Sequence, residues 1–298
     1  MYPEFLCIGA MKTGTTWLWA NLRQHPDIWL PRKKEIHYFT GWDNPDPSWH
    51  RHLIRSLRRP GLKSMLFSDL WRMRFRSVPW ELRYLFGRRN DRWYASLFEG
   101  GRGKVSGDMS ASYAGLDMPA VEHVFALMPD VKVIYGLRDP IDRAWSHALM
   151  AVDLRIEAFR HSKRRQYEEL NLEDFIRFFE SPLAGYQGDF LRTFQIWDTY
   201  CPEHHFFTFF MEDLVNRPAE LLIDTYKFLG VDCASHLVPD SAARKVRAGA
   251  GHAMPDPVRQ YLARVYHPQI LRLQRSKRFS GQHAEYIESW RKNAVTWL

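Results

Sequence analysis

The first 22 residues contain the feature that most constrains the fold. An apolar run at residues 5–9 has the length of a buried strand, a short loop contains Gly14, and an amphipathic segment continues to Leu22. The glycines at positions 9 and 14 allow a tight turn, so that amide N–H groups at the start of the helix point at one spot. The helix dipole favours negative charge there. This segment therefore predicts a strand, a phosphate-binding loop and a helix.

The loop differs from the nucleotide-binding loop of NTPases in the place of its lysine. In the NTPase pattern, a lysine follows the second glycine and a hydroxyl residue binds magnesium. Here Thr15 follows Gly14, and the lysine lies earlier in the loop, at Lys12. This arrangement favours a phosphate whose bridging oxygen is a leaving group, with charge supplied by a side chain rather than by a metal. An ordinary strand–turn–helix connection is the alternative.

A second segment, residues 25–39, favours the functional interpretation. It contains the run from Lys34 through Glu35 and His37 to Phe39. Together with the loop, this run resembles the sulfotransferases that use 3′-phosphoadenosine 5′-phosphosulfate (PAPS), and it is similar to the lysine–glutamate segment of their carbohydrate and tyrosyl branches. The resemblance implies that Glu35 is the catalytic base. His37 would face the same side of an extended segment and is the alternative base.

The same resemblance implies donor-binding roles for the loop. Lys12 would neutralise the charge that develops on the bridging oxygen as its bond to sulfur breaks. Loop amides, Thr15 and Thr16 would hold the 5′-phosphate. Trp17 matches a tryptophan that packs near adenine, although a place in the helix core fits equally well. The expected donor-binding residues of this segment are Lys12, Thr13, Gly14, Thr15, Thr16 and Trp17.

A third segment follows a predicted buried strand at residues 131–137. Asp139 is suited to cap a helix and Pro140 to begin one, so Arg138 lies at the tip of the strand. Ser146 is eight residues beyond Arg138, close to one helical face after two turns. The pair can bind a second phosphate through hydrogen bonds. It also matches the 3′-phosphate motif of the family. A cap followed by a solvated serine is the structural alternative.

Residues 107–113 resemble another segment of the family, with Asp108, Ser110 and Tyr113 at matching positions. Met109 stands where several branches carry a lysine. If that lysine neutralises the leaving group in those branches, a different cation, or none, does so here.

A basic loop is expected at the far end of the donor site. Arg244, Lys245 and Arg247 are interleaved with glycines, which suits a loop that closes over a doubly phosphorylated nucleotide. The family has a basic, glycine-containing loop near this point that touches the 3′-phosphate, and the resemblance implies the same contact. A solvated surface loop is the alternative.

The order of strands and helices predicts one α/β domain over residues 1–298, with a P-loop-like parallel sheet flanked by helices on both faces. The ligand is expected at the carboxyl ends of the strands. Further helices are predicted at residues 172–179, 185–197 and 218–229, with a final helix starting near Pro255. Glu212 and Asp213 are interpreted as helix caps.

Residues 44–92 are expected to form an insertion or lid that recognises the acceptor. From residue 43 to residue 104 there are 14 Lys or Arg and 6 Asp or Glu, a surplus of eight that equals the surplus of the whole chain. Basic and aromatic side chains together suit an anionic acceptor, a sugar, a lipid headgroup or a nucleic acid. The expected acceptor is a small molecule, a carbohydrate, a lipid or a carrier-bound group that presents a hydroxyl or, less often, an amine. No nucleic-acid partner is expected, and peripheral membrane contact stays open. A solvated helical lid is the alternative.

The composition argues against several other classes. Three cysteines without paired spacing indicate neither a disulfide framework nor a zinc site, and no metal is expected. The chain has no run of membrane-spanning length and no room for a signal peptide before the first predicted strand, which favours a cytoplasmic enzyme. Two other functions stay open: a small-molecule kinase with a variant phosphate loop, and a catalytically silent binding protein on the same fold.

Overall fold

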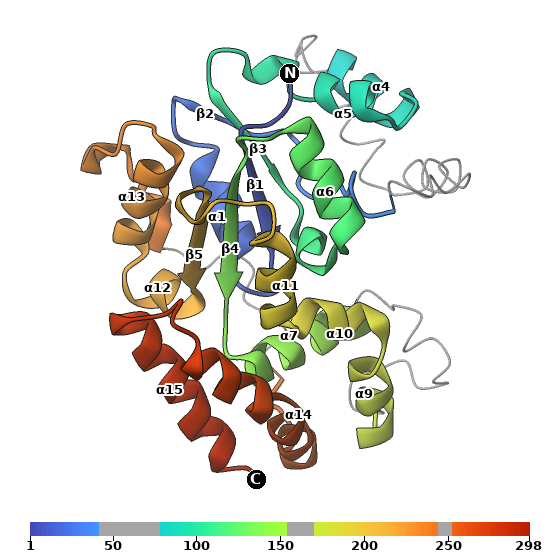
Figure 1. Ribbon diagram of the computed structural model, residues 1–298, viewed down its shortest axis with the longest axis vertical. Helices are drawn as coiled ribbons and strands as arrows, with labels where there is room; N and C mark the ends of the chain where they lie inside the picture. Colours follow the sequence, from blue (N-terminus) through green and yellow to red (C-terminus); the bar gives the residue numbers. More distant parts are fainter. Residues whose placement is uncertain (42–77, 154–169, 244–251) are drawn as a thin grey trace.

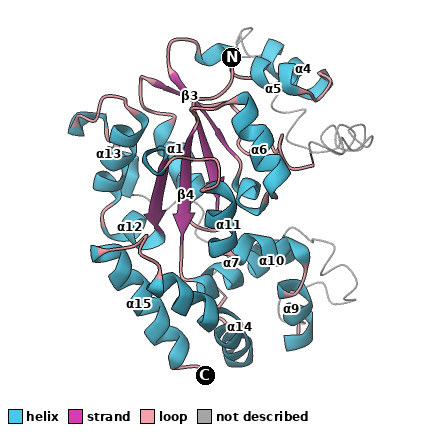
Figure 2. Cartoon of the chain, viewed as in Figure 1, coloured by secondary structure: helices cyan, strands magenta, loops and turns pink. Residues whose placement is uncertain are grey.

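The computed structural model describes residues 1–41, 78–153, 170–243 and 252–298 (Figure 1). Its centre is a five-stranded sheet in the order β2-β3-β1-β4-β5, in which every neighbouring pair is parallel. The strands are β1 (Phe5–Gly9), β2 (Ile28–Trp29), β3 (Val105–Met109), β4 (Lys132–Leu137) and β5 (Phe206–Phe210). Helices lie on both faces of the sheet (Figure 2). The predicted single α/β domain with a parallel sheet is confirmed.

The side chains of β1 alternate between two hydrophobic clusters. Leu6 and Ile8 belong to one cluster and Phe5 and Cys7 to the other, and all four are buried. The first cluster includes residues of α6 (Met118–Leu127) and α11 (Phe190–Trp197), and the second includes residues of α1 (Thr15–Leu22) and α13 (Pro218–Leu229). Because successive strand residues point to opposite faces, a strand that is apolar throughout needs cover on both sides.

The segments that follow the parallel strands lie together at the carboxyl ends of the strands, which form one edge of the sheet. β1 leads into the phosphate loop and α1, β3 into the 3-10 turn η2 (Ala111–Gly115), β4 into α7 (Pro140–Asp153), and β5 into α12 (Met211–Asn216). Two long helices, α14 (Asp256–Arg275) and α15 (Gly281–Val295), lie beyond this edge (Figure 1). Ligands of open parallel sheets bind outside the carboxyl ends of the strands, so a site is expected here.

The remaining helices and turns connect these layers. They are α4 (Val78–Phe86), α5 (Asp91–Ser96), η1 (Glu99–Gly101), α9 (Leu172–Phe179), α10 (Pro182–Gly188), η4 (Glu203–His205), η5 (Ser235–Leu237) and η6 (Asp240–Ala243). In the part of the chain that the structure describes, no helix is both long enough and apolar enough to cross a membrane.

Three of the predicted helices are confirmed and one prediction is wrong in detail. α9 and α13 match their predicted ranges. The helix predicted at residues 185–197 is instead the pair α10 and α11. It breaks at Asp189, which has φ −91° and ψ 84°, and whose side chain accepts the N–H of Arg192 to cap α11. The predicted helix near Pro255 is α14, which begins at Asp256, and α15 follows it.

The two acidic residues after β5 have different structural roles. Asp213 accepts the N–H of Phe210 at 2.9 Å, so its prediction as a cap is confirmed. Glu212 lies in the first turn of α12, and its carboxylate accepts a hydrogen bond from the indole N–H of Trp290 at 2.6 Å, which ties α12 to α15.

Candidate active site

The phosphate loop after β1 is held in shape from the inside. Gly14 is the N-cap of α1 and has a φ of 89°, a left-handed conformation that favours glycine. Thr13 is fully buried, and its hydroxyl donates to the carbonyl oxygen of Ala10 at 2.7 Å. The Thr13 side chain therefore shapes the loop, and its backbone is the part left to contact an anion.

The start of α1 offers backbone donors to a ligand. The first helical hydrogen bond runs from Leu18 N–H to the Gly14 carbonyl at 3.1 Å, so the N–H groups of Thr15, Thr16 and Trp17 precede the helical ladder. The first turn of this described helix contains no acidic residue. Amides and helix dipole together suit this end of α1, called the anion site below, to binding an anion.

Gly9 brings the phosphate loop against the turn that follows β3. Its φ is 136°, and a Cβ at this position would lie 2.7 Å from the carbonyl oxygen of Ala111. A larger residue would push the two segments apart. The N–H of Ala111 in turn donates to Oε2 of Glu35 at 2.8 Å. The loop and the predicted base are therefore positioned by the same turn, η2.

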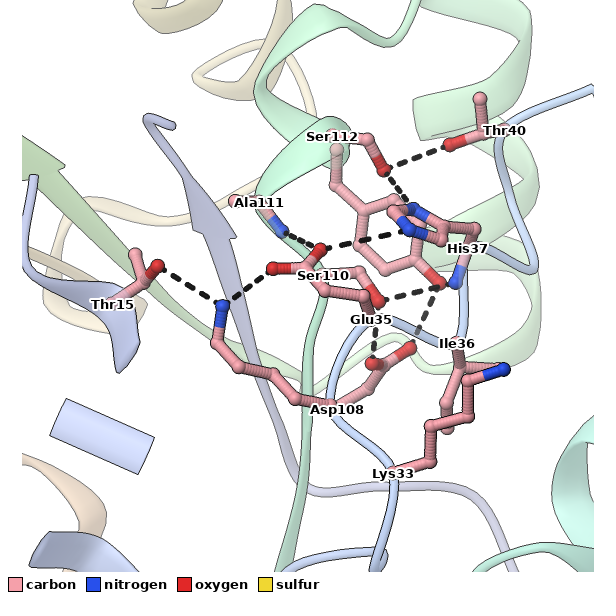
Figure 3. A network of polar contacts seen from close by, with 12 residues as sticks. Thr15, Lys33, Glu35, Ile36, His37, Thr40, Asp108, Ser110, Ala111 and Ser112 are labelled. Carbon is pink, nitrogen blue, oxygen red and sulfur yellow. Dashed lines mark hydrogen bonds and ion pairs between the residues drawn. The ribbon is translucent and has the colours of Figure 1, made fainter. Parts of the chain in front are cut away.

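Glu35 is fixed by three contacts and is partly exposed to solvent. Figure 3 shows the contacts of its carboxylate. Its backbone N–H donates to the carbonyl of Met109 at 3.2 Å. Its Oε2 accepts the Ala111 N–H, and its Oε1 accepts a hydrogen bond from the Lys34 ammonium at 2.5 Å. The side chain is 27% exposed. The carboxylate is oriented and also accessible to an acceptor.

His37 lies next to Glu35 with its ring anchored at one nitrogen. Nδ1 is 2.7 Å from the Ser112 hydroxyl, and Nε2 is 3.9 Å from Oε2 of Glu35. Burial lowers the pKa of His37 despite the opposing effect of the Glu35 carboxylate. The imidazole is therefore neutral at pH 7, and Nε2 faces the carboxylate.

The backbone at these positions is strained. Lys12, Glu35 and His37 have φ values of 73°, 67° and 57°, and they are the non-glycine residues with positive φ in the described ranges. A left-handed conformation costs a non-glycine residue on the order of 1 kcal/mol or more, and such residues concentrate at active sites. They are also the residues that the sequence predicts as catalytic.

A buried network lies under residues 33–39, called the base segment below, and fixes the backbone of His37 and Tyr38. Asp108 is buried and accepts hydrogen bonds from the hydroxyls of Ser110 at 2.8 Å and Tyr113 at 2.8 Å. Those hydroxyls accept the backbone N–H groups of His37 at 3.2 Å and Tyr38 at 2.9 Å. Asp108 thus fixes the base segment through two intermediate side chains. Burial raises the pKa of Asp108 to about 6, although the hydroxyl donors oppose that effect.

Helices α4 and α5 support the base segment from its other side. Arg89 donates to the carbonyl of Ile36 at 2.9 Å, and the Tyr38 hydroxyl donates to Asp91 at 2.6 Å. The Lys33 ammonium donates to the Tyr84 hydroxyl at 2.5 Å. Within the predicted insertion at residues 44–92, the described part from 78 onward therefore packs on the base segment. Residues 42–77 lie outside the described residues.

Lys34 connects Glu35 to the phosphate loop, although it is not among the site residues predicted from the sequence. Its ammonium is 3.2 Å from the Thr15 hydroxyl and 2.5 Å from Oε1 of Glu35. The available signal was its position directly before Glu35. Met109 is buried in the cluster that contains residues of α1, so the position that carries a lysine in several branches belongs to the core here.

Arg138 lies between β4 and α7, and Ser146 lies in the middle of α7. The Arg138 guanidinium donates to the carbonyl of Lys12 at 3.3 Å, which joins β4 to the phosphate loop. Asp139 caps α7 by accepting the N–H of Ile141 at 2.9 Å. Ser146 is partly exposed on α7. Burial lowers the pKa of Arg138, and the neighbouring carboxylates of Asp142 and Asp139 oppose that effect.

Two further titratable residues of α7 were missed by the sequence analysis. Arg143 is fully buried, and none of its guanidinium nitrogens has a hydrogen-bond partner among the described residues. Burial, with the charges of Arg143 and Lys12, lowers the pKa of His147 to about 3, so its ring is neutral. Lys12, Arg138 and Arg143 therefore bring three cations to this edge of the sheet, which suits a ligand with several negative charges.

Comparison with known proteins places the chain in a family. The sequence profile of the Sulfotransferase family matches residues 3–235. This chain belongs to the sulfotransferase family. The crystal structure of a sulfotransferase from Alicyclobacillus acidocaldarius matches this sulfotransferase with a TM-score of 0.66 and 25% identity, over 98% of this chain and 99% of that one. The family and the fold indicate a transferase of sulfuryl groups.

Two other matches are more limited. The sulfotransferase domain from the curacin biosynthetic pathway has a TM-score of 0.50 and 15% identity, over 97% of each chain, which is a likeness of fold. The membrane-associated sulfotransferase kil1 of Dictyostelium discoideum is 44% identical over 48 residues, which are 16% of this chain and 10% of that protein. The matched part thus spans a tenth of the length of this curated relative.

Family membership decides against the kinase alternative, because the profile covers both the phosphate loop and the Arg138 motif.

In residues 1–41, 78–153, 170–243 and 252–298, no group of three His, Cys, Asp or Glu side chains is arranged to hold a metal ion.

Trp17 of this sulfotransferase lies in the core. It is 3% exposed, and its indole N–H donates to the carbonyl of Ala242 at 2.8 Å. One turn later, the side-chain oxygen of Asn21 accepts a hydrogen bond from the Ser241 hydroxyl at 3.2 Å. This position fits the helix-core role expected for Trp17, and the expected contact of its ring with the donor stays a prediction. The predicted basic loop with Arg244, Lys245 and Arg247 lies outside the described residues, directly after this anchored segment.

The strain at Lys12 predicts an unusual order of stabilities. We expect the Lys12→Gly variant to be more stable than Lys12→Ala by about 1 kcal/mol, because glycine adopts a positive φ at little cost. At Lys227, an exposed residue of α13, the order of the same two substitutions should be reversed. Urea unfolding of the four variants measures both differences. Equal stabilities of the two Lys12 variants would show that the loop is unstrained.

The raised pKa of Asp108 predicts a specific pH dependence. Since its folded-state pKa of about 6 exceeds the ordinary value of 3.8, the folded protein binds the proton more tightly than the unfolded chain. The contribution of Asp108 to the unfolding free energy therefore falls as pH rises from about 4 to 6, by about 3 kcal/mol in total. Asp108→Asn should remove that part of the slope in urea unfolding. Identical slopes in both proteins would contradict the assignment.

Proposed function

We propose that this protein transfers a sulfuryl group from PAPS to a hydroxyl acceptor, with Glu35 as the general base. The observation that carries the proposal is the position of the base beside the anion site. Lys34 contacts both the Glu35 carboxylate and the first residue of α1, at 2.5 and 3.2 Å. A phosphosulfate bound at the start of α1 would present its sulfur close to the carboxylate.

The described residues fit a doubly phosphorylated donor. The amides of α1, with Thr15 and Thr16, would hold the 5′-phosphate, and Arg138 with Ser146 would hold the 3′-phosphate. Lys12 would neutralise the negative charge that develops on the bridging oxygen. When bound, the donor supplies an activated sulfuryl group. Arg244, Lys245 and Arg247 are proposed as further contacts to the 3′-phosphate.

Glu35 would accept the proton of the acceptor hydroxyl as that oxygen attacks sulfur. A new O–S bond forms, the bond from sulfur to the bridging oxygen breaks, and the electron pair stays on the 5′-phosphate. The partial exposure of Glu35 lets it return the proton to solvent. The neutral ring of His37 is the alternative base, because its Nε2 lies on the same side.

We further propose a relation to the carbohydrate and tyrosyl branches of the family and a cytoplasmic location. The acceptor would be a small molecule, a carbohydrate, a lipid or a carrier-bound group, and an amine is the less favoured nucleophile. Residues 44–92 would recognise it, since their described part packs directly on the base segment.

The donor assignment predicts a preference among nucleotides. The protein should bind adenosine 3′,5′-bisphosphate at least tenfold more tightly than adenosine 5′-phosphate, because a charged hydrogen bond contributes about 1.5–3 kcal/mol. Arg138→Ala should remove most of this preference, whereas Arg177→Ala on the exposed face of α9 should leave it unchanged. Calorimetry measures the affinities. Equal affinity of the wild-type protein for both nucleotides would refute the donor assignment.

The base assignment predicts a selective loss of turnover. Glu35→Gln keeps the shape of the side chain but cannot accept the proton, so kcat should fall by roughly 10²–10⁴-fold while the bisphosphate still binds. Turnover is measured with labelled PAPS and an acceptor selected by screening phenols, sugars, lipids and carrier-bound alcohols. If His37→Ala abolishes turnover and Glu35→Gln has a small effect, His37 is the base.

A further inference from the structure

Lys34 is shared between the base and the anion site. Its side chain is 16% exposed, so both contacts form in a largely desolvated place. One partner is the Glu35 carboxylate and the other is the hydroxyl of Thr15, the first residue of α1. An ammonium has three hydrogens to donate and no fixed plane. It can therefore exchange partners by rotating the end of its side chain.

In this arrangement both oxygens of the base are engaged. Oε2 accepts the Ala111 N–H and Oε1 accepts the Lys34 ammonium. A proton added at Oε1 would face the hydrogens of the ammonium. The contact with Ala111 is made by the backbone of η2, which does not rotate, so Lys34 is the partner that can move.

A bound donor would compete with Glu35 for the Lys34 ammonium. A phosphosulfate at the start of α1 brings negative oxygens next to Thr15, and these compete with Glu35 for the ammonium. Building on the function proposed above, we propose that Lys34 couples donor binding to the base. Without donor it pairs with Glu35. With donor it pairs with the phosphosulfate and releases Oε1 to accept the acceptor proton.

The neighbouring cations do not fit this role. Lys33 donates to the Tyr84 hydroxyl and lies over its ring at 4.2 Å, so it faces α4. Arg138 is bonded to the carbonyl of Lys12. The core position of Met109 leaves the leaving group without the lysine of other branches, and Lys34 would supply that charge beside Lys12.

The proposed coupling has a measurable consequence for donor binding. If Glu35 competes with the nucleotide for Lys34, removing the carboxylate should strengthen nucleotide binding. We expect Glu35→Gln to tighten the affinity for adenosine 3′,5′-bisphosphate on the order of tenfold. We expect Lys34→Met to weaken it by a similar factor. In the double variant, Glu35→Gln should bring no further gain, because the shared ammonium is gone.

Calorimetry on the full chain measures this cycle of four proteins, and Lys33→Met, which removes the adjacent ammonium, should bind like the wild type. Thermal unfolding verifies that each variant is folded, and Glu35→Ala replaces Glu35→Gln if that protein does not fold. If Glu35→Gln leaves the affinity unchanged, or tightens it equally in the Lys34→Met background, the coupling is refuted. If the wild-type protein does not bind the bisphosphate, the proposed function itself fails.

Discussion

The close approach of Gly9 to Ala111 is the contact on which the arrangement of the site depends. Since a Cβ at Gly9 would lie 2.7 Å from the Ala111 carbonyl, only glycine allows the loop after β1 to lie against the turn after β3. The same turn supplies the N–H that orients Glu35. The anion site and Glu35 therefore lie together because two neighbouring parallel strands end beside each other, and Lys34 spans the short distance between them.

The site is built at a cost in stability. Lys12, Glu35 and His37 hold left-handed backbone conformations, Asp108 is a carboxylate with a raised pKa, and Arg143 is a buried cation without a described partner. Each of these features destabilises a folded chain. The compensation comes from a core that covers both faces of the sheet and from the hydrogen bonds that fix the base segment.

The parts of the molecule that local sequence determines were predictable. The strand, loop and helix at the N-terminus and the junction at Arg138 depend on nearby residues with strong conformational preferences, such as Gly14 and Pro140. The family motifs added the identity of the candidate base. The parallel sheet followed from the alternation of apolar strands with amphipathic helices, and the structure confirms it.

Contacts between distant segments were not predictable. The support of the base segment by Asp108 joins residues more than 70 positions apart through two hydroxyls, and no local pattern reveals it. The break at Asp189 was missed because a capping aspartate within an amphipathic run looks like a surface residue of a continuous helix. Lys34 was passed over because its role arises only when α1 and the base segment lie side by side.

Ala242 and Ser241 are hydrogen-bonded to α1, so this helix sets the distance between them and the phosphate loop. Its first turn faces the anion site, and its body holds the segment that enters the predicted basic loop at residue 244. The two ends of the expected nucleotide site would therefore both be positioned by α1, a helix of eight residues. One residue inserted before Trp17 would rotate the indole by about 100° around the helix axis and detach the segment. The length and phase of α1 thus set where residues 241 and 242 lie relative to the phosphate loop.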